Sequence, residues 1–263
     1  MMVLKFANRY GRAHGGRVGA RSDQPTLRRV YPTGVPRPLT IHTMPLPAIE
    51  IETGPQPVAT MIVLHGLGAQ GDDFEPVCDA LDMKSVGAMR YVLPHAPQQP
   101  VTLNGGMMMP AWYDILGLGG QGGEDEAGLR ASQLRIEALI AREVERGVPA
   151  HRIVLAGFSQ GCAMTLLTGL RHAQPLAGLV CLSGYLPLAA KTAAERSPAN
   201  LATPIFMAHG RQDSMIPLAR ASASRDALQA LGYAVHWHEY PMQHSVCIEE
   251  IHDLNRFLLK VLA

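Results

Sequence analysis

The pattern of apolar and polar positions changes regularly along this chain, from short runs of apolar residues to amphipathic stretches. The apolar runs predict buried strands, because a strand covered on both faces carries apolar residues at nearly every position. We expect these strands at residues 60–65, 89–93, 153–156, 179–182, 204–208 and 234–240, with an edge strand within residues 44–54.

Helical spacing of apolar residues marks the stretches between these strands. The clearest helix has acidic residues in its first turn and ends at Gly147. Strands that alternate with helices predict an α/β fold with a mostly parallel central sheet and helices on both faces. We expect helices at residues 72–81, 124–146, 217–231 and 248–262, and another directly after residue 161.

Residues 1–43 depart from this alternation. They are rich in Gly, Pro and Arg and show no helical or strand periodicity. We therefore expect a disordered basic N-terminal extension, followed by one folded domain at residues 44–263. A basic arm for nucleic acid or membrane, an organellar presequence and an over-long start assignment are the alternatives for this extension.

Residues 98–123 form a second departure, because they are rich in Gly, Met and Pro and show no clear element. Loops this long are usually functional. We predict that Met107, Met108, Met109 and Trp112 line an irregular, apolar substrate pocket built from a mobile segment. A solvated flexible loop is the alternative, and it suits residues 117–123 better than the methionines and the tryptophan.

Charge is divided unevenly along the chain. Residues 1–43 hold eight of the 23 Lys and Arg side chains and one acidic residue, so the remainder has 15 basic and 21 acidic residues, a net charge of −6. An acidic body argues against a nucleic-acid-binding domain. The four cysteines lack paired or C-x-x-C spacing and are expected to be reduced thiols of a cytoplasmic protein.

No apolar run approaches the length of a membrane span, and no signal-peptide core is visible. We therefore expect no stable membrane insertion. The sequence leaves the oligomeric state open, and a homodimer is one option.

One apolar run leads into the turn Gly157-Phe158-Ser159-Gln160-Gly161, which a helix-compatible stretch follows. A strand, a G-x-S-x-G turn and a helix are the context of a nucleophile elbow. The elbow is tight, so a side chain at Gly157 or Gly161 would collide with the turn or with the incoming helix. The alternative is a Gly-rich turn with an ordinary surface serine, but the flanking strand and helix favour Ser159 as a nucleophile.

A serine hydroxyl needs a histidine to take its proton and a carboxylate to orient that histidine. When the serine lies on such an elbow, the acid and then the histidine follow it in the chain. Asp213 follows a predicted strand, whereas Glu195 and Asp226 fall in loop or helical segments. His244 lies in a loop between a strand and a helix, whereas His252 lies in the last helix. We therefore predict Asp213 as the acid and His244 as the base.

A Gly-rich loop at residues 66–71 follows a buried strand, but the Lys-Ser/Thr of a phosphate-binding loop is absent. A backbone N–H of such a loop can supply one donor of an oxyanion hole, and the residue after the nucleophile supplies the other. We assign these two donors to Leu67 and Gln160.

Other histidines show no pattern of a metal site. His236 and His238 share one strand face, but no third ligand at characteristic spacing accompanies them. We expect packing or surface positions for both, and neither a metal nor an organic cofactor. His65 and His209 each follow a strand and precede a glycine, and we expect structural hydrogen bonds from both.

Several stretches together resemble a known family. They are L-H-G-L-G (64–68), P-H-A-P-Q-Q-P-V-T-L-N-G-G (94–106), A-W-Y-D-I (111–115), G-F-S-Q-G (157–161) and H-G-R-Q-D (209–213), with His244. From about residue 46 to the C-terminus, the chain is similar to the phospholipase/carboxylesterase family. That family includes acyl-protein thioesterases and small bacterial carboxylesterases, and the bacterial enzymes are the closer match.

The resemblance implies an α/β-hydrolase fold and places the nucleophile, acid and base at Ser159, Asp213 and His244. It also implies oxyanion donors at Leu67 and Gln160, and an acyl pocket bordered by the region around the tryptophan at position 112.

The combined prediction is a serine carboxylesterase that hydrolyses short- to medium-chain carboxylic esters through an acyl-enzyme. The alternative within the same chemistry is an acyl-protein or acyl-CoA thioesterase or a lysophospholipase. The alternative of another class is a catalytically silent binding protein with the same fold. That alternative requires a broken triad, and none of the three predicted members is missing.

Overall fold

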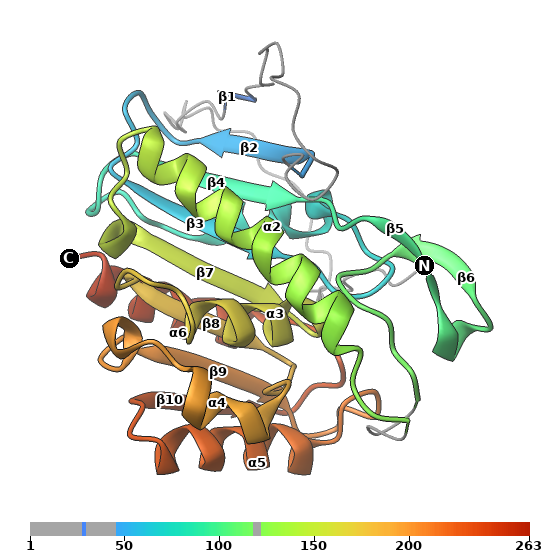
Figure 1. The fold of residues 1–263 in the computed structure, drawn as a ribbon. Coiled ribbons are helices and arrows are strands. Elements are labelled where there is room, and N and C mark those ends of the chain that lie inside the picture. The colour runs from blue at the N-terminus through green and yellow to red at the C-terminus, as the bar shows by residue number, and fades with distance from the viewer. Residues whose placement is uncertain (1–27, 30–45, 118–121) are drawn as a thin grey trace, which may run out of the picture.

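The computed structural model describes residues 28–29, 46–117 and 122–263, in which strands and helices alternate (Figure 1). The strands are β1 (Arg28–Arg29), β2 (Ala48–Glu52), β3 (Ala59–Leu64), β4 (Met89–Pro94), β5 (Gln98–Val101), β6 (Met107–Pro110), β7 (Ile153–Phe158), β8 (Gly178–Leu182), β9 (Ile205–Gly210) and β10 (Val235–Tyr240). The helices are α1 (Glu75–Ala80), α2 (Glu126–Glu145), α3 (Gln160–Gly169), α4 (Ala189–Glu195), α5 (Leu218–Ala230) and α6 (Ile248–Val261).

Eight strands form one sheet in the order β1-β2-β4-β3-β7-β8-β9-β10. In this sheet, the neighbouring strands β4, β3, β7, β8, β9 and β10 pair parallel, whereas β2 pairs antiparallel with both β1 and β4. Every residue of β3, β7 and β8 is buried, which explains the unbroken apolar runs in the sequence. The predicted mostly parallel central sheet is therefore confirmed.

Helices cover both faces of the sheet, and each face has its own apolar core. Side chains of α2, α3 and α5 pack on one face against residues such as Ile62 and Leu155. Side chains of α1 and α6 pack on the other face against residues such as Met61 and Val154. Adjacent residues of one strand thus serve opposite cores, as strand geometry requires. In Figure 1, α2 and α3 lie in front of the sheet and α6 lies behind it.

The helix bounds differ from the predicted ones for local reasons. The predicted helix at residues 72–81 is a 3-10 turn, Gly71–Phe74, followed by α1, because Pro76 is tolerated only in the first turn of a helix. α2 begins after Asp125, whose carboxylate accepts the Gly128 N–H at 2.9 Å as a cap. α4 was not predicted. Within the described residues, no helix is long and apolar enough to cross a membrane.

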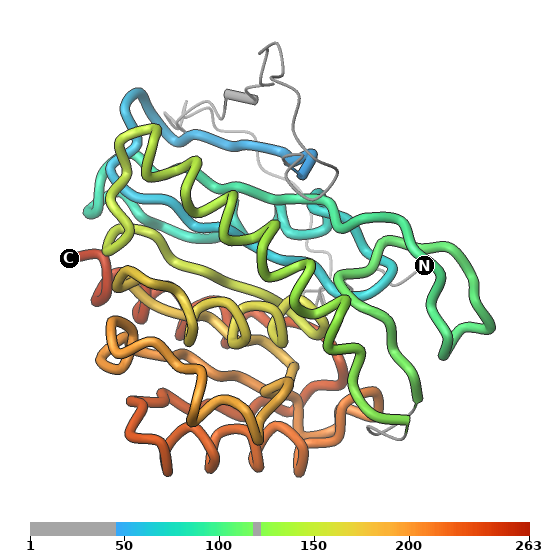
Figure 2. The backbone as a smooth tube through the Cα atoms, viewed as in Figure 1, coloured from blue at the N-terminus to red at the C-terminus, as the bar shows by residue number. Residues whose placement is uncertain are grey.

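Residues 98–110 form a β-hairpin, where we expected a loop without regular structure. β5 and β6 pair antiparallel, with Gln98 opposite Pro110. The turn between them includes Gly105, whose φ of 67° lies in the left-handed region that glycine adopts easily. Pro100 interrupts any strand pattern in the sequence, so this hairpin is recognisable only from its pairing. Figure 2 shows the hairpin standing away from the main sheet.

Most of the predicted N-terminal extension lies outside the described residues. Arg28 and Arg29 are the exception, since they pair as β1 with Glu52 and Ile51 of β2, where we expected no strand. The edge of β2 offers unpaired backbone groups, which two residues can join without any apolar pattern. The domain boundary at residue 44 and the disorder of the extension stay predictions.

Candidate active site

Three residues that were predicted to act together meet at the carboxyl edge of the parallel strands. Ser159 directly follows β7, Asp213 lies in the loop after β9, and His244 lies in the loop between β10 and α6. Loops at this edge are where open α/β sheets bind ligands. The topology therefore brings residues that are distant in the sequence into one site.

The turn after β7 is a sharp elbow. Ser159 has φ 56° and ψ −116°, a strained conformation for a residue with a side chain. A Cβ atom at Gly157 would collide with the Gly161 carbonyl oxygen, and a Cβ atom at Gly161 would collide with the Leu64 carbonyl oxygen. Both positions therefore require glycine, as expected, and Ser159 lines the adjoining pocket.

His244 bridges the other two residues. Its Nε2 lies 2.9 Å from Ser159 Oγ, and its Nδ1 lies 2.7 Å from Asp213 Oδ2. An ionised carboxylate only accepts hydrogen bonds, so Nδ1 carries the hydrogen and Nε2 is left to accept the serine proton. The imidazole ring also packs against the Phe158 ring, with centroids 4.8 Å apart. The arrangement suits a base that is oriented on one side and faces a hydroxyl on the other.

Asp213 is held in place and ionised by its neighbours. Its Oδ1 accepts the N–H groups of Met215 and Ile216, both at 2.9 Å, and its Oδ2 lies 3.3 Å from His209 Nε2. Burial alone would raise the pKa of Asp213. Hydrogen bonds from His209, His244 and the Ile216 N–H nevertheless hold its pKa well below the usual range. Asp213 therefore stays negatively charged at neutral pH and can orient the imidazole.

Leu67 and Gln160, the predicted oxyanion donors, both line the pocket that contains Ser159. Among the described residues, no hydrogen bond occupies the backbone N–H of either one. Unoccupied N–H groups beside a nucleophile can stabilise a negatively charged oxygen as it forms. Their position fits the predicted role, which stays a prediction.

The two histidines that precede glycines make structural hydrogen bonds. His65 Nδ1 donates to the Gly66 carbonyl oxygen at 2.7 Å, and its Nε2 accepts the Ala96 N–H at 3.0 Å. Burial lowers the pKa of His65, so the ring stays neutral and keeps both bonds. His209 Nε2 lies 2.8 Å from the Ile216 carbonyl oxygen, next to the acid of the site.

The side chain of Gln160 joins the elbow to the segment after the hairpin. Its Oε1 accepts the Trp112 N–H at 2.8 Å, and its Nε2 donates to the Tyr113 carbonyl oxygen at 2.7 Å. The Trp112 indole is fully buried and donates to the His65 carbonyl oxygen at 2.8 Å. Trp112 does not line the pocket, so its predicted role as a pocket wall is wrong. A large ring with one satisfied donor acts here as a core residue.

The pocket beside Ser159 has a volume of about 480 Å³. Met107 and Met109 line it, whereas Met108 does not and is 59% exposed. Alternate residues of a strand point to opposite sides, so the strand β6 separates the three methionines. The predicted pocket wall is therefore wrong for Met108. Met107 and Met109 lie on a strand and not on an irregular loop, and the mobility of the segment stays a prediction.

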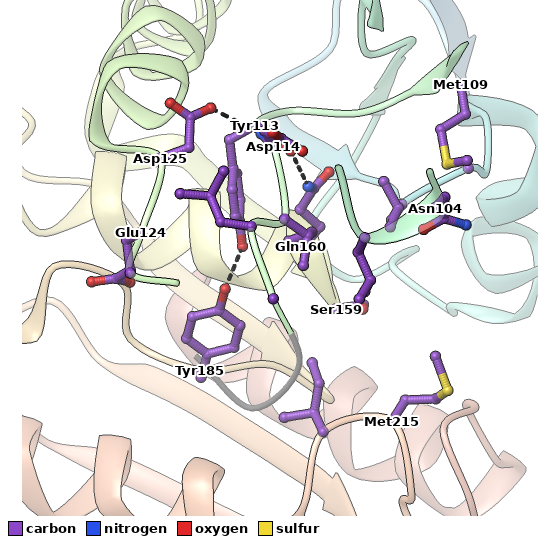
Figure 3. Close-up of a pocket in the computed structure, with 18 of the residues that line it drawn as sticks. Asn104, Met109, Tyr113, Asp114, Glu124, Asp125, Ser159, Gln160, Tyr185 and Met215 are labelled. Atoms are coloured by element: carbon purple, nitrogen blue, oxygen red, sulfur yellow. Dashed lines mark hydrogen bonds between the residues drawn. The ribbon is translucent and has the colours of Figure 1, made fainter. Parts of the chain in front are cut away.

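The other side of the pocket is polar, and the sequence did not reveal it. The hydroxyls of Tyr113 and Tyr185 form a hydrogen bond of 2.9 Å (Figure 3), and Arg220 packs over the Tyr185 ring. Glu124 lines the same pocket. These residues come from separate parts of the chain, so no local pattern links them. In the sequence, only the motif at residues 111–115, which contains Tyr113, pointed to this side of the pocket.

In the part of the chain that the structure describes, no three His, Cys, Asp or Glu side chains are grouped to hold a metal. His236 and His238 instead pack against the rings of Phe257 and Phe206, at 5.6 and 4.8 Å between centroids. They occupy the packing positions that the sequence suggested.

Known sequences resemble this chain over nearly all of its described part. Residues 46–262 match the family described as Phospholipase/Carboxylesterase. An acyl-protein thioesterase 1 from Mycosarcoma maydis is 44% identical over 229 residues, which cover 81% of this chain and 95% of that protein. Another, from Neurospora crassa, is 42% identical over 209 residues, which cover 76% of this chain and 85% of that protein.

Solved structures share the same arrangement of sheet and helices. Acyl-protein thioesterase 2 from Zea mays has a TM-score of 0.71 and 27% identity, covering 81% of this chain and 99% of that one. SOBER1 from Arabidopsis thaliana has a TM-score of 0.74 and 27% identity, covering 78% of this chain and 99% of that one. With its matching sequence and α/β-hydrolase fold, the chain belongs to the phospholipase/carboxylesterase family.

Proposed function

We propose that this protein is a serine carboxylesterase that hydrolyses short- to medium-chain carboxylic esters through an acyl-enzyme. Ser159 is the nucleophile, His244 is the general base, and Asp213 orients His244. One observation carries this proposal: His244 makes hydrogen bonds of 2.9 Å to Ser159 Oγ and 2.7 Å to Asp213 Oδ2.

In the first half of the reaction, Ser159 Oγ attacks the ester carbonyl carbon while His244 Nε2 takes the hydroxyl proton. The carbonyl oxygen becomes negative, and the N–H groups of Leu67 and Gln160 stabilise it. His244 then gives its proton to the alcohol oxygen, which departs. In the second half, water loses a proton to His244 and attacks the acyl carbon. The bond from the acyl carbon to Ser159 Oγ then breaks, His244 returns the proton to Oγ, and the carboxylic acid is released.

The preference for short to medium acyl chains follows from the hairpin side of the pocket. Met107 and Met109 are flexible apolar side chains that can adapt to an acyl chain. Each buried methylene contributes up to about 0.8 kcal/mol. We therefore expect kcat/KM to rise over the first few carbons and to fall once the pocket of about 480 Å³ is full.

The names of the relatives favour a second candidate, the hydrolysis of thioesters on acylated proteins or acyl-CoA. The attack on the carbonyl is the same, and a thiol departs in place of an alcohol. The two candidates therefore differ in the substrate and not in the catalytic residues.

Paired p-nitrophenyl esters and acyl thioesters of graded chain length test both candidates. A carboxylesterase has the higher kcat/KM on the ester of each pair, and the opposite ranking would establish the second candidate. In the same protein, a fluorophosphonate should add one adduct at Ser159 by intact-mass spectrometry, and Ser159→Ala should add none. An adduct at another residue of active protein would contradict the proposed nucleophile.

A cytoplasmic location is part of the proposal. The four cysteines, Cys78, Cys162, Cys181 and Cys247, are free. Burial strongly raises the pKa of the Cys181 thiol, which lies beside Cys162, and such inert thiols suit a reducing compartment. Cell fractionation beside a cytoplasmic marker tests this location, and recovery with the membrane or outside the cell would contradict it.

A further inference from the structure

The pocket that contains Ser159 has two walls of different chemistry. The hairpin supplies an apolar wall that includes Met109. Tyr113, Tyr185 and Arg220 belong to a polar wall, built from the segments after β6 and β8 and from the first turn of α5. In Figure 3, the labelled Met109 and Tyr185 lie on opposite sides of Ser159. A substrate bound at the nucleophile therefore meets an apolar surface on one side and a polar surface on the other.

Arg220 is the cation of the polar wall. Its guanidinium carbon lies 3.4 Å from the centroid of the Tyr185 ring, and the residue is half-buried. Among the described residues, no carboxylate lies within 4.0 Å of this guanidinium. Arg225 on the same helix differs, because it pairs with Asp226 at 2.7 Å and does not line the pocket. In the described part of the chain, helix α5 thus carries one arginine without a carboxylate partner, Arg220, and one with such a partner, Arg225.

Three carboxylates line the same pocket, and each already accepts hydrogen bonds from the protein. Asp114 accepts the N–H and the hydroxyl of Thr102 at 2.7 and 2.5 Å. Asp125 accepts the Asp114 N–H at 2.9 Å, and Glu124 accepts the Leu188 N–H at 3.0 and 3.1 Å. These groups have their own partners, so the guanidinium remains available to a ligand.

Stacking holds Arg220 in place before a substrate arrives. Tyr185, which lies against the guanidinium, is itself fixed by the 2.9 Å hydrogen bond to Tyr113. Burial raises the pKa of both tyrosines, so both hydroxyls keep their protons and one proton remains to be donated. A guanidinium that is already restrained loses less conformational freedom when it binds an anion.

We propose that Arg220, together with the Tyr113–Tyr185 pair, selects esters that carry a carboxylate at a second position. This inference rests on the proposed esterase function, because the ester carbonyl must reach Ser159 while the carboxylate reaches Arg220. A planar guanidinium can bind a carboxylate with two parallel hydrogen bonds. The three carboxylates of the pocket repel a doubly charged phosphate more than a singly charged group, so a carboxylate is the better match.

Matched substrate pairs test this selection. Each pair consists of a p-nitrophenyl hemiester of a dicarboxylic acid and the p-nitrophenyl ester of the unbranched fatty acid with the same number of carbons. The readout is the ratio of kcat/KM for the charged ester over the neutral ester, as the number of methylenes is varied. The ratio should peak at one spacer length, because the carboxylate must span from Ser159 to Arg220. A second series, phenyl butyrates with and without a carboxylate on the ring, distinguishes the alcohol side from the acyl side.

Variants assign the effect to one side chain. Arg220→Met should lower the peak ratio about tenfold or more, the loss expected when charge-assisted hydrogen bonds are removed. Arg220→Lys should keep part of the ratio, because it keeps the charge and loses the paired donors. Glu124→Gln should raise the ratio by removing a nearby negative charge. Arg225→Met is the matched control and should leave the ratio unchanged.

Salt gives an independent readout, since added salt should lower the ratio in the parent protein. A parent protein that shows no peak in the hemiester series and no preference for the ring carboxylate in the second series would overturn the selection, even if neutral esters are hydrolysed. So would a preference that is equal in the parent and in Arg220→Met. If Arg220→Met does not fold, the ratio in Arg220→Lys decides. Failure to hydrolyse either member of the pairs, with no fluorophosphonate adduct at Ser159, would instead contradict the esterase function itself.

Discussion

The nucleophile elbow and the pocket walls beside it are held by different kinds of contact. At the elbow, Gly157 and Gly161 pack so closely against backbone carbonyls that no side chain fits. Along the pocket, Met107 and Met215 are 62% and 65% exposed, although both line it. Backbone contacts place the reacting groups, whereas exposed side chains shape the space for the substrate. Changes at the two regions should therefore affect different measurements.

The largest effect should come from His244, whose imidazole contacts Ser159 of the elbow. His244→Ala should lower kcat by about 10⁴-fold or more, because Ser159 loses the group that we propose takes its proton. Asp213→Asn should cost about the same, since the imidazole is then held in the wrong tautomer. Steady-state rates on the best p-nitrophenyl ester measure both losses, and the melting temperature shows whether the variants fold. A folded His244→Ala that retains a tenth of the parent rate would place the base elsewhere.

Trp112 and Met108, which lie close together in the sequence, sharpen the comparison between a buried residue and an exposed one. Trp112→Ala should lower the free energy of unfolding by about 3–5 kcal/mol, because a fully buried ring and its hydrogen bond to the His65 carbonyl are lost. Met108→Ala should change it by less than about 0.5 kcal/mol, because Met108 is exposed. Urea denaturation measures both. Similar losses in the two variants would contradict the distinction between them.

Glu250 should make the stability of the protein depend on pH, because it lies fully buried in the first turn of α6. Burial raises its pKa from 4.5 to about 8, so the folded protein holds a proton that the unfolded chain has lost. Its stabilising contribution is therefore complete below pH 4.5 and is lost as the pH rises toward 8.

Because of Glu250, the free energy of unfolding should fall by at most about 1.4 kcal/mol per pH unit. Glu250→Gln cannot ionise, so its free energy of unfolding should fall less than that of the parent between pH 5 and pH 8. Urea titrations at several pH values measure the difference. Parallel curves for the parent and the variant would show that the Glu250 carboxyl titrates normally.

The smallest effect should come from the apolar wall. Met109→Ala should lower kcat/KM on medium-chain esters about threefold to tenfold relative to the shortest ester, because one or two methylenes lose their burial. Met108→Ala is the control, because this side chain does not line the pocket. A chain-length profile shows the result directly. A uniform loss over all chain lengths would mean that Met109 supports the reacting groups and not the acyl chain.

Buried strands and the elbow could be predicted from the sequence because their local environment is uniform. Every residue of β7 is buried, so the run of apolar residues leading to Ser159 is unbroken. Asp213 and His244 could be anticipated from their order and place in the chain. Asp213 is the acid that follows a predicted strand after Ser159, and His244 is the histidine that lies in a loop between a strand and a helix after Asp213. Parallel strands place such loops at one edge, so their meeting follows from the fold class.

The hairpin and the polar wall could not be predicted, because both depend on contacts between distant residues. β5 contains Pro100, and three of its four residues are exposed or partly exposed, so it lacks an alternating pattern. Arg220 and Tyr185 lie on separate elements and meet only when α5 packs beside the loop after β8. Trp112 belongs to a motif near the site. Its buried position is recognisable only from its contacts with distant residues, since its N–H donates to Gln160 Oε1 and its indole donates to the His65 carbonyl oxygen.

The hairpin is tied to the body at its base and again where β5 ends. There the Leu103 N–H donates to the Ile115 carbonyl oxygen at 2.9 Å, and Thr102 donates to the Asp114 carboxylate. At the base there are two further bonds. The Gly68 N–H donates to the Pro110 carbonyl oxygen at 2.8 Å, and the Ala111 N–H donates to the Pro97 carbonyl oxygen at 3.0 Å. At its tip, a side chain added at Gly105 would meet nothing within 4 Å. The turn at Gly105 and Gly106 is therefore the part of the hairpin that can be lengthened, shortened or exchanged while these bonds stay in place. Substrate range can thus diverge between members of this family without any change in the catalytic residues.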